Sequence, residues 1–206
     1  MCIVLVTRTK KYSIILSNRD EFLARPTLHA TWWPSPHSQV LAGRDLARPQ
    51  HGTWLGITRQ GRIAVLTNYR EESEVGASSA AISRGEITNE FLLSEKGIEE
   101  WIQEVLASGV YTNVGGFSLM CAVLRKQQRG YAVVSNRSSL EKGADYILTK
   151  ENEAEVVGYE CDGLSNSLLH DEWPKVKIGK ELLQKLASKD ITDEETFIEE
   201  CFDLLS

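Results

Sequence analysis

A cysteine stands directly after the first methionine, at the head of a short apolar run, Cys2–Val6. A second apolar run, Tyr12–Ser17, leads into four polar residues, Asn18–Glu21. If the two runs pair as a β-hairpin, the start of the first lies beside the end of the second. The sequence therefore predicts a thiol, a guanidinium and carboxylates together at one edge of a sheet.

These groups could carry out nucleophilic catalysis. Met1 precedes a small residue, so we expect a methionine aminopeptidase to remove it and leave Cys2 with a thiol and an α-amine. An α-amine has an ordinary pKa of about 7.7–8.0 and can act as the general base for the thiol of its own residue. Arg19 could favour the thiolate and hold a substrate carboxylate or carbonyl, while Asp20 or Glu21 could orient the ammonium. The alternative is a buried cysteine followed by a solvated turn.

Five short motifs extend along the chain in a fixed order: Met-Cys at the start, Asn18–Glu21, Gly52–Gly56, Thr67–Tyr69 and Gly163–Asn166. In this order and spacing the chain resembles the NRDE family, also called the transport and Golgi organisation protein two family. That family is similar to the cysteine branch of the N-terminal nucleophile (Ntn) hydrolases, which contains bile salt hydrolases and penicillin V acylases. The resemblance implies an α+β fold, a four-layer αββα sandwich with mostly antiparallel sheets, formed as one domain over residues 1–206.

The same resemblance implies a set of catalytic residues. Cys2 matches the nucleophile, Arg19 matches an arginine after the second strand, and Asp20 is the preferred acidic partner. Asn68 and Asn166 match two asparagines that help to form an oxyanion site. One such amide donor is typically worth about 10²–10³ in rate. The alternative is that both asparagines close turns, which is a common role for this residue.

Four further side chains are predicted to bind substrate: Asn18, Glu21, Trp54 and Tyr69. Asp20 and Glu21 are adjacent, and adjacent strand residues point to opposite faces, so only one of the two should face Cys2. An apolar pocket near this edge could be lined by Trp32, Trp33, Trp54 and Tyr69. No histidine has a neighbour at metal-ligand spacing, and we expect neither a metal nor a cofactor.

The composition limits the classes of function. The chain has 206 residues, 42% of them hydrophobic and 25% charged, and a formal net charge of −6 without a basic cluster. This argues against nucleic-acid binding.

No run approaches the roughly 20 apolar residues of a membrane helix, and the first residues do not form a secretory signal. We expect a cytoplasmic protein without membrane insertion, and Golgi or mitochondrial association stays open. The four cysteines form no CxxC pair, which favours reduced thiols.

Periodicity and turn residues predict the remaining elements. Strands are expected at residues 39–42, 53–58, 62–68, 116–124, 130–135, 146–148 and 156–159. The first of these lies in a long connection, Phe22–Gln50. Helices are expected at residues 84–93, 98–106, 175–187 and from about 192 to the end. Ser83 with Glu86, and Thr192 with Glu195, predict capping boxes at two of the helix starts, and Gly109 is expected to end a third helix.

The chain departs from the family at its last residues. Family members usually extend further and carry a Tyr-Gly-Thr-Arg-like motif, whereas this chain stops at Phe202–Ser206. Either the chain is a C-terminally shortened or fragmentary member of the family, or its last strands are absent. An incomplete sheet would leave an open edge, which favours self-association.

Two functions are consistent with these features. The first is an Ntn-type cysteine hydrolase that cleaves or transfers an amide-linked acyl group through a Cys2 thioester. The second is a non-catalytic module that binds acyl-CoA, lipid or haem and supports Golgi organisation, protein secretion and lipid homeostasis. The expected ligand is accordingly a small amide, acyl-CoA or a lipid-like molecule.

Overall fold

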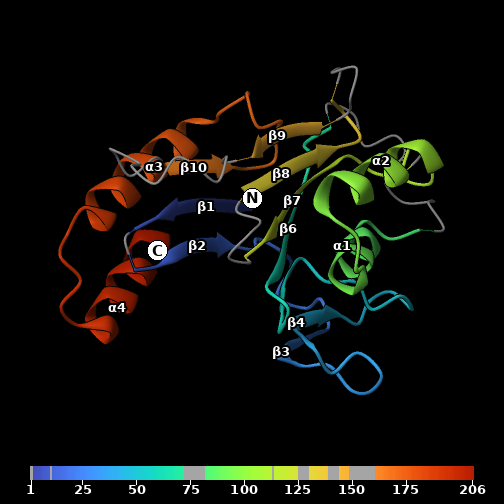
Figure 1. Cartoon of the computed structure of the whole chain (residues 1–206), viewed down its shortest axis with the longest axis horizontal. Coiled ribbons are helices and arrows are strands. Elements are labelled where there is room, and N and C mark those ends of the chain that lie inside the picture. The colour runs from blue at the N-terminus through green and yellow to red at the C-terminus, as the bar shows by residue number, and fades with distance from the viewer. Residues whose placement is uncertain are drawn as a thin grey trace. The chain divides into compact units, whose positions relative to one another are not determined.

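The computed structural model describes residues 2–9, 11–71, 82–112, 114–124, 130–138, 144–148 and 161–206. The chain divides into two compact units, the first formed by residues 1–20 and 154–206 and the second by residues 21–153. Each unit combines one antiparallel sheet with two helices, as the element labels in Figure 1 show. The predicted α+β class with antiparallel sheets is confirmed.

The first unit contains a three-stranded sheet in the order β10-β1-β2. Its strands are β1 (Ile3–Arg8), β2 (Ser13–Asn18) and β10 (Cys161–Leu164). The predicted hairpin of β1 and β2 is confirmed, because Ile3 lies opposite Asn18 and the backbone N–H of Thr9 donates to the Tyr12 carbonyl across the turn. Strand β1 is therefore paired along both of its edges.

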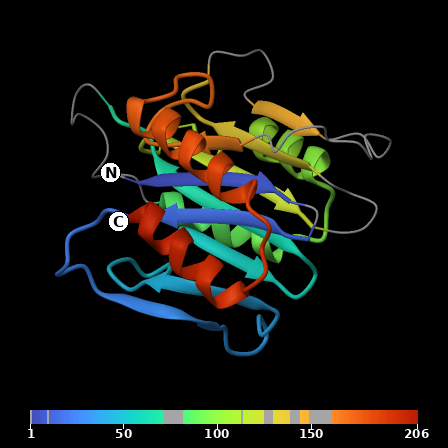
Figure 2. The ribbon, with the colours of Figure 1, turned by 90° about the vertical axis from the view of Figure 1, so that its left-hand side faces the viewer.

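Two helices, α3 (Pro174–Ala187) and α4 (Glu194–Leu205), lie over one face of this sheet (Figure 2). Between them and the strands is an apolar core that includes Leu5, Ile14, Leu183 and Phe197. Helix α3 approaches the sheet closely at Gly179, where an added Cβ would lie 2.8 Å from a Leu5 methyl carbon. Helix α3 can thus lie this close to β1 because the residue at position 179 is glycine, which has no Cβ.

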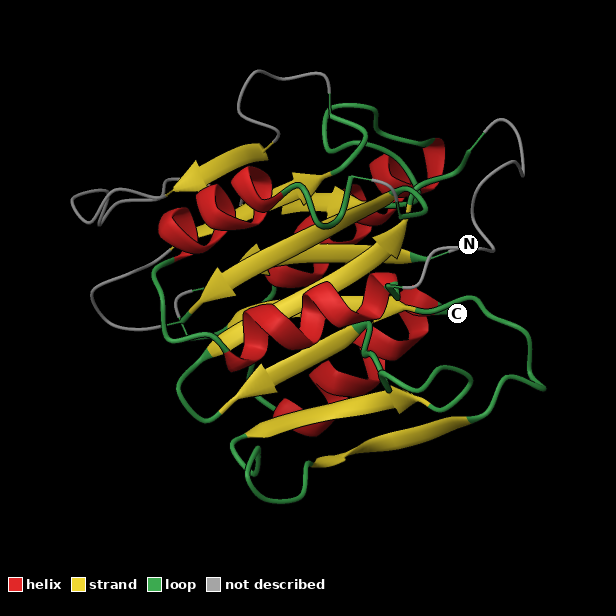
Figure 3. Ribbon diagram, turned by 90° about the vertical axis from the view of Figure 1, so that its right-hand side faces the viewer, coloured by secondary structure: helices red, strands yellow, loops and turns green. Residues whose placement is uncertain are grey.

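The second unit contains a seven-stranded antiparallel sheet whose strands are neighbours in chain order. They are β3 (Thr27–Trp32), β4 (Val40–Asp45), β5 (Leu55–Thr58), β6 (Arg62–Asn68), β7 (Phe117–Val123), β8 (Gly130–Ser135) and β9 (Ala144–Leu148). Helices α1 (Arg84–Leu93) and α2 (Ile98–Ser108) cover one face (Figure 3).

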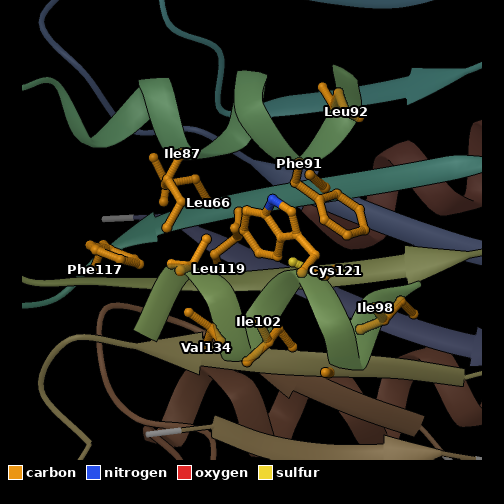
Figure 4. Packing of buried hydrophobic residues seen from close by; sticks show 14 of the residues in the cluster. Leu66, Ile87, Phe91, Leu92, Ile98, Ile102, Phe117, Leu119, Cys121 and Val134 are labelled. Atoms are coloured by element: carbon orange, nitrogen blue, oxygen red, sulfur yellow. The ribbon is translucent and has the colours of Figure 1, made fainter. Parts of the chain in front are cut away.

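The core of the second unit forms where α1 and α2 meet the sheet (Figure 4). Phe91 of α1 and Trp101 of α2 pack edge to face with ring centroids 4.9 Å apart. The Arg62 guanidinium lies over the Phe91 ring and donates to the carbonyls of Phe91 and Lys96 at 2.8 and 2.6 Å. A buried cation is thereby supplied with acceptors at the end of a helix.

Some predicted elements need correction. The connection Phe22–Gln50 contains two strands, and the prediction missed β3 because all six of its residues are exposed and show no alternation. Ser83 does not cap α1 with its side chain, and α4 begins with Asp193 rather than Thr192 as its cap. The Asp193 carboxylate is the better acceptor next to the free N–H groups of a first turn.

The other predicted elements agree closely. Gly109 ends α2 with a left-handed backbone conformation, as expected, although the helix reaches Ser108. Pro174 is the first residue of α3. The predicted strand at 156–159 lies outside the described residues. Within the described part of the chain, no helix is long and apolar enough to cross a membrane.

We expect Phe91→Ala to lower the free energy of unfolding by about 3–5 kcal/mol, because Phe91 is fully buried between α1 and α2. Phe202→Ala removes the same ring from a site that is 69% exposed and should cost less than about 1 kcal/mol. Urea denaturation followed by circular dichroism measures both. Equal losses in the two variants would contradict this packing.

Candidate functional site

Cys2 lies immediately before β1, between the ends of two neighbouring strands. The β1–β2 register pairs Ile3 with Asn18, and the β1–β10 register pairs Val4 with Leu164. Cys2 directly precedes β1, Arg19 directly follows β2, and Asn166 follows β10 by two residues, so all three lie just beyond these paired positions. Three of the predicted catalytic residues therefore belong to one end of one sheet.

Two side chains hold the backbone of Cys2. The Ser165 hydroxyl donates to the Cys2 carbonyl oxygen at 2.8 Å, and the Lys175 ammonium donates to the same oxygen at 2.9 Å. Ser165 is buried and Lys175 is half-buried. A carbonyl with two donors, one of them charged, has little freedom to rotate. The residue that carries the candidate nucleophile is thus fixed from the β10 side.

The sequence motifs assign no role to Lys175 or Ser165. Lys175 is the second residue of α3, directly after Pro174. Cations are disfavoured at this end of a helix, where the macrodipole is positive, and this first turn contains no acidic residue. A lysine directly after the proline that begins a helix is therefore unexpected, and this was the feature of the sequence that could have pointed to a special role for Lys175. Burial lowers the pKa of the Lys175 ammonium, and the neighbouring Cys2 thiolate opposes this shift.

The residues after β2 have different environments. The Asn18 side-chain amide donates to the carbonyl of Leu205 at the end of α4, which indicates a structural role in addition to the predicted substrate contact. Arg19 is half-buried and Asp20 is exposed. Glu21 belongs to the second unit, where its carboxylate accepts from the Phe22 N–H and lies 3.7 Å from the Arg25 guanidinium. The choice of Asp20 over Glu21 as the acidic partner stays a prediction.

Asn166 follows β10 in a buried turn. The hydroxyls of its two neighbours are both engaged, Ser165 with Cys2 and Ser167 with the carbonyls of Leu168 and Asp171. Asn166 itself is 9% exposed. The turn is therefore held by side chain to backbone hydrogen bonds on either side of the amide that we predict to stabilise an oxyanion.

The remaining predicted residues lie in the second unit. Asn68 ends β6 opposite Phe117, and the Tyr69 N–H donates to the Gly116 carbonyl. Trp54 packs against the core of that unit, with its ring beside Gly43. These contacts give Trp54 a structural role, and its role in substrate binding stays a prediction. The convergence of Trp54, Asn68 and Tyr69 with Cys2 also stays a prediction.

The two tryptophans proposed for an apolar pocket have separate environments. Trp33 is buried in the core, and its indole N–H donates to the Ala42 carbonyl. Trp32 lies on the edge strand β3, and the Arg59 guanidinium sits 3.8 Å from its ring centroid. Burial gives Trp33 a packing role, and the cation–π contact occupies one face of Trp32.

The other three cysteines differ from Cys2 in exposure. Cys121, Cys161 and Cys201 are buried, whereas Cys2 is partly exposed. Burial raises the thiol pKa of each buried cysteine, most strongly for Cys121. Among the described residues, no three His, Cys, Asp or Glu side chains converge in a way that could hold a metal ion.

Comparison with solved structures identifies the fold. A Caenorhabditis elegans ortholog of N-acylethanolamine-hydrolyzing acid amidase matches with a TM-score of 0.51 and 12% sequence identity, over 97% of this chain and 85% of that one. The fold is therefore of the Ntn-hydrolase type, as the motifs implied.

Comparison of sequences identifies the family. The family model for Transport and Golgi organisation 2 matches residues 1–206, and the chain belongs to this family. It is 34% identical to a Bos taurus Transport and Golgi organization protein 2 homolog over 88% of this chain, but spans only 63% of that protein's length. It is also 34% identical to Saccharomyces cerevisiae YGR127W, over 100% of this chain and 69% of the yeast protein.

We expect iodoacetamide at neutral pH to alkylate Cys2 at least about tenfold faster than Cys121, Cys161 or Cys201, because Cys2 is partly exposed, whereas the other three are buried and burial raises their thiol pKa. Peptide mapping by mass spectrometry at timed quenches measures the four rates. Unfolding in guanidinium chloride should make the rates similar. Labelling of a buried cysteine as fast as Cys2 in the folded protein would contradict the site.

Proposed function

We propose that this protein is an amide hydrolase that uses Cys2, freed of Met1, as its nucleophile. The observation that carries the proposal is the position of Cys2 directly before β1, at the end of the sheet where β2 leads into Arg19 and β10 into Asn166, with its carbonyl fixed by Ser165 and Lys175. Membership of the family and the Ntn-type fold support it.

The reaction follows from the groups at this edge. The α-amine of Cys2 takes the thiol proton while sulfur attacks the amide carbonyl, and the Asn166 amide donates to the oxygen that becomes negative. Collapse of the tetrahedral intermediate breaks the C–N bond, and the ammonium returns its proton to the leaving amine. Water then attacks the thioester, with the α-amine again as base. The products are a carboxylic acid, an amine and the free thiol.

The substrate class is an N-acyl amide. The worm structural neighbour is named as an ortholog of an amidase that hydrolyses N-acylethanolamines, which are amides of this kind. In this proposal Arg19 binds the carbonyl or a carboxylate of the substrate. Asp20 orients the α-ammonium. Asn68 supplies a second oxyanion donor.

We expect Cys2→Ala to reduce turnover of N-acyl amides by at least about 10³-fold while the folded state is kept. Alanine is also small, so Met1 removal is the same and only the thiol is lost. Cys161→Ala is the matched control, because Cys161 pairs with Thr7 near the other end of β1. A panel of long-chain N-acylethanolamines and fluorogenic short-chain N-acyl amides measures turnover, and the intact mass establishes that Met1 is gone. Undiminished turnover in Cys2→Ala, or quantitative retention of Met1, would rule out the mechanism.

A second candidate function is the binding of an acyl chain without turnover. It is favoured by a groove of about 270 Å³ between β2 and α4, lined by Tyr12–Leu16 and by residues of α4 that include Ile198 and Phe202. The volume is close to the lower end of ligand pockets, which run from about 300 to 1,000 Å³. Ile198 and Phe202 are 47% and 69% exposed, so apolar surface is available there.

Under this second function, Phe202→Gln should weaken binding of a fluorescent long-chain fatty acid or acyl-CoA by about 10- to 100-fold, since a buried Phe contributes about 1.5–3 kcal/mol. Phe22→Gln is the matched control, because Phe22 is 83% exposed and outside the groove. Fluorescence titration gives the Kd. Equal affinities in the two variants would remove the groove as the binding site.

A further inference from the structure

The Lys175 ammonium is the charged group that the structure brings onto the backbone of Cys2. Its Nζ lies 2.9 Å from the Cys2 carbonyl oxygen. The nitrogen and carbonyl oxygen of one residue are at most about 3.6 Å apart, so Nζ lies within about 6.5 Å of the Cys2 nitrogen. Once Met1 is removed, that nitrogen is an amine, and a nearby cation disfavours its protonated form.

The fold holds Lys175 in this place by two independent features. Pro174 starts α3 directly before Lys175, and its fixed φ suits the first helical position. The close approach at Gly163 and Gly179 then fixes α3 over β1 and β10, because a Cβ at either glycine would meet a carbon atom at 2.7–2.8 Å. The Trp173 ring lies 5.8 Å from Nζ and shields one side of it. The position of the ammonium is thus built into the packing.

We propose that Lys175 is a positioning residue that fixes Cys2 through its carbonyl and keeps the Cys2 α-amine unprotonated at neutral pH, so that the amine can act as a base. The inference deepens the proposed hydrolase function and rests on it, since a base at Cys2 serves only that chemistry. Lys175 does not touch the substrate in this role. It acts through the residue that does.

Other charges near Cys2 divide into two groups. Arg19, after β2, adds to the effect of Lys175, while Asp20 opposes it. Along the connection from β10 to α3 the titratable side chains are His170, Asp171 and Glu172, and α3 itself carries Lys177, Lys180, Glu181 and Lys185 besides Lys175. Glu172 and Lys180 pair with each other at 2.6 Å and largely cancel. The Cys2 thiolate is the charge that acts on Lys175 directly. The test must therefore separate the effect of Lys175 on the amine pKa from the effects of these other charges.

The test measures the amine itself. The full chain is made as a fusion whose protease cleavage leaves Cys2 as the first residue, so every molecule carries the α-amine. Cysteine is labelled with ¹³C, and the Cα and Cβ resonances of Cys2, identified by their loss in Cys2→Ser, are followed from about pH 5 to pH 10. The amine and thiol titrate as a coupled pair, and two apparent pKa values are obtained. Hydrolysis of N-acyl amides is measured on the same samples.

In Lys175→Met and Lys175→Gln we expect the apparent pKa of the amine to rise by about one unit, since a unit charge at this distance is partly screened by solvent. The acidic limb of kcat/KM should move to higher pH by the same amount. Lys175→Arg keeps the cation and should keep the parent value. Lys177→Met, at an exposed lysine of the same helix, is the matched control. Thermal melts establish that each variant is folded.

An unchanged amine pKa in both neutral variants would overturn the inference, whatever the activity. A rise that also occurs in Lys177→Met would overturn it as well, since a general change in charge would then be the cause. The raised pKa without any Cys2-dependent turnover leaves the tuning by Lys175 in place and removes the proposed hydrolase. Cys2-dependent turnover without a rise in the amine pKa keeps the proposed hydrolase and removes the tuning by Lys175.

Discussion

The two hydrogen-bonded ladders along β1 are the constraint on which the candidate site depends. A strand paired on one side only can slip in register, and a slip of one residue turns every side chain to the other face. Strand β1 is paired with β2 on one edge and with β10 on the other, and the two partners come from distant parts of the chain. Both registers must be correct together, and the residue before Ile3 then has only one position.

The charged and polar groups that flank Cys2 differ between its two neighbouring strands. The side of β10 and α3 contributes neutral hydroxyl and amide groups, a positive helix end and one ammonium. The side of β2 contributes a guanidinium and a carboxylate. A cation such as the Lys175 ammonium lowers the cost of a thiolate beside it and raises the cost of a second ammonium, and in the proposed mechanism both changes make an N-terminal cysteine more reactive. In the proposed hydrolase, the helix start that holds the backbone of Cys2 also tunes its amine.

Much of this arrangement could be predicted from the sequence, for physical reasons. The β1–β2 hairpin joins two apolar runs by a short polar turn, and such local pairings leave a clear pattern. The helices α1 and α2 have buried residues at helical spacing, such as Ile87, Phe91 and Ile102. Strand β3 was missed because an edge strand that is exposed on both faces needs no alternation of apolar and polar residues, so its sequence has no strand pattern. Lys175 was missed because its contact with Cys2 spans 173 residues and depends on the packing of α3, which no local pattern encodes.

The first unit is discontinuous in sequence, and this determines when the site can form during synthesis. Residues 2–20 are synthesised before β10 and α3, which complete their sheet and its cover and come after residue 160. At roughly 5–20 residues per second, the intervening 140 residues (21–160) require on the order of ten seconds. Until then β1 has no β10, and Cys2 lacks Ser165, Asn166 and Lys175. The surroundings of Cys2 are therefore completed only after α3 has been synthesised, late in the synthesis of this unit.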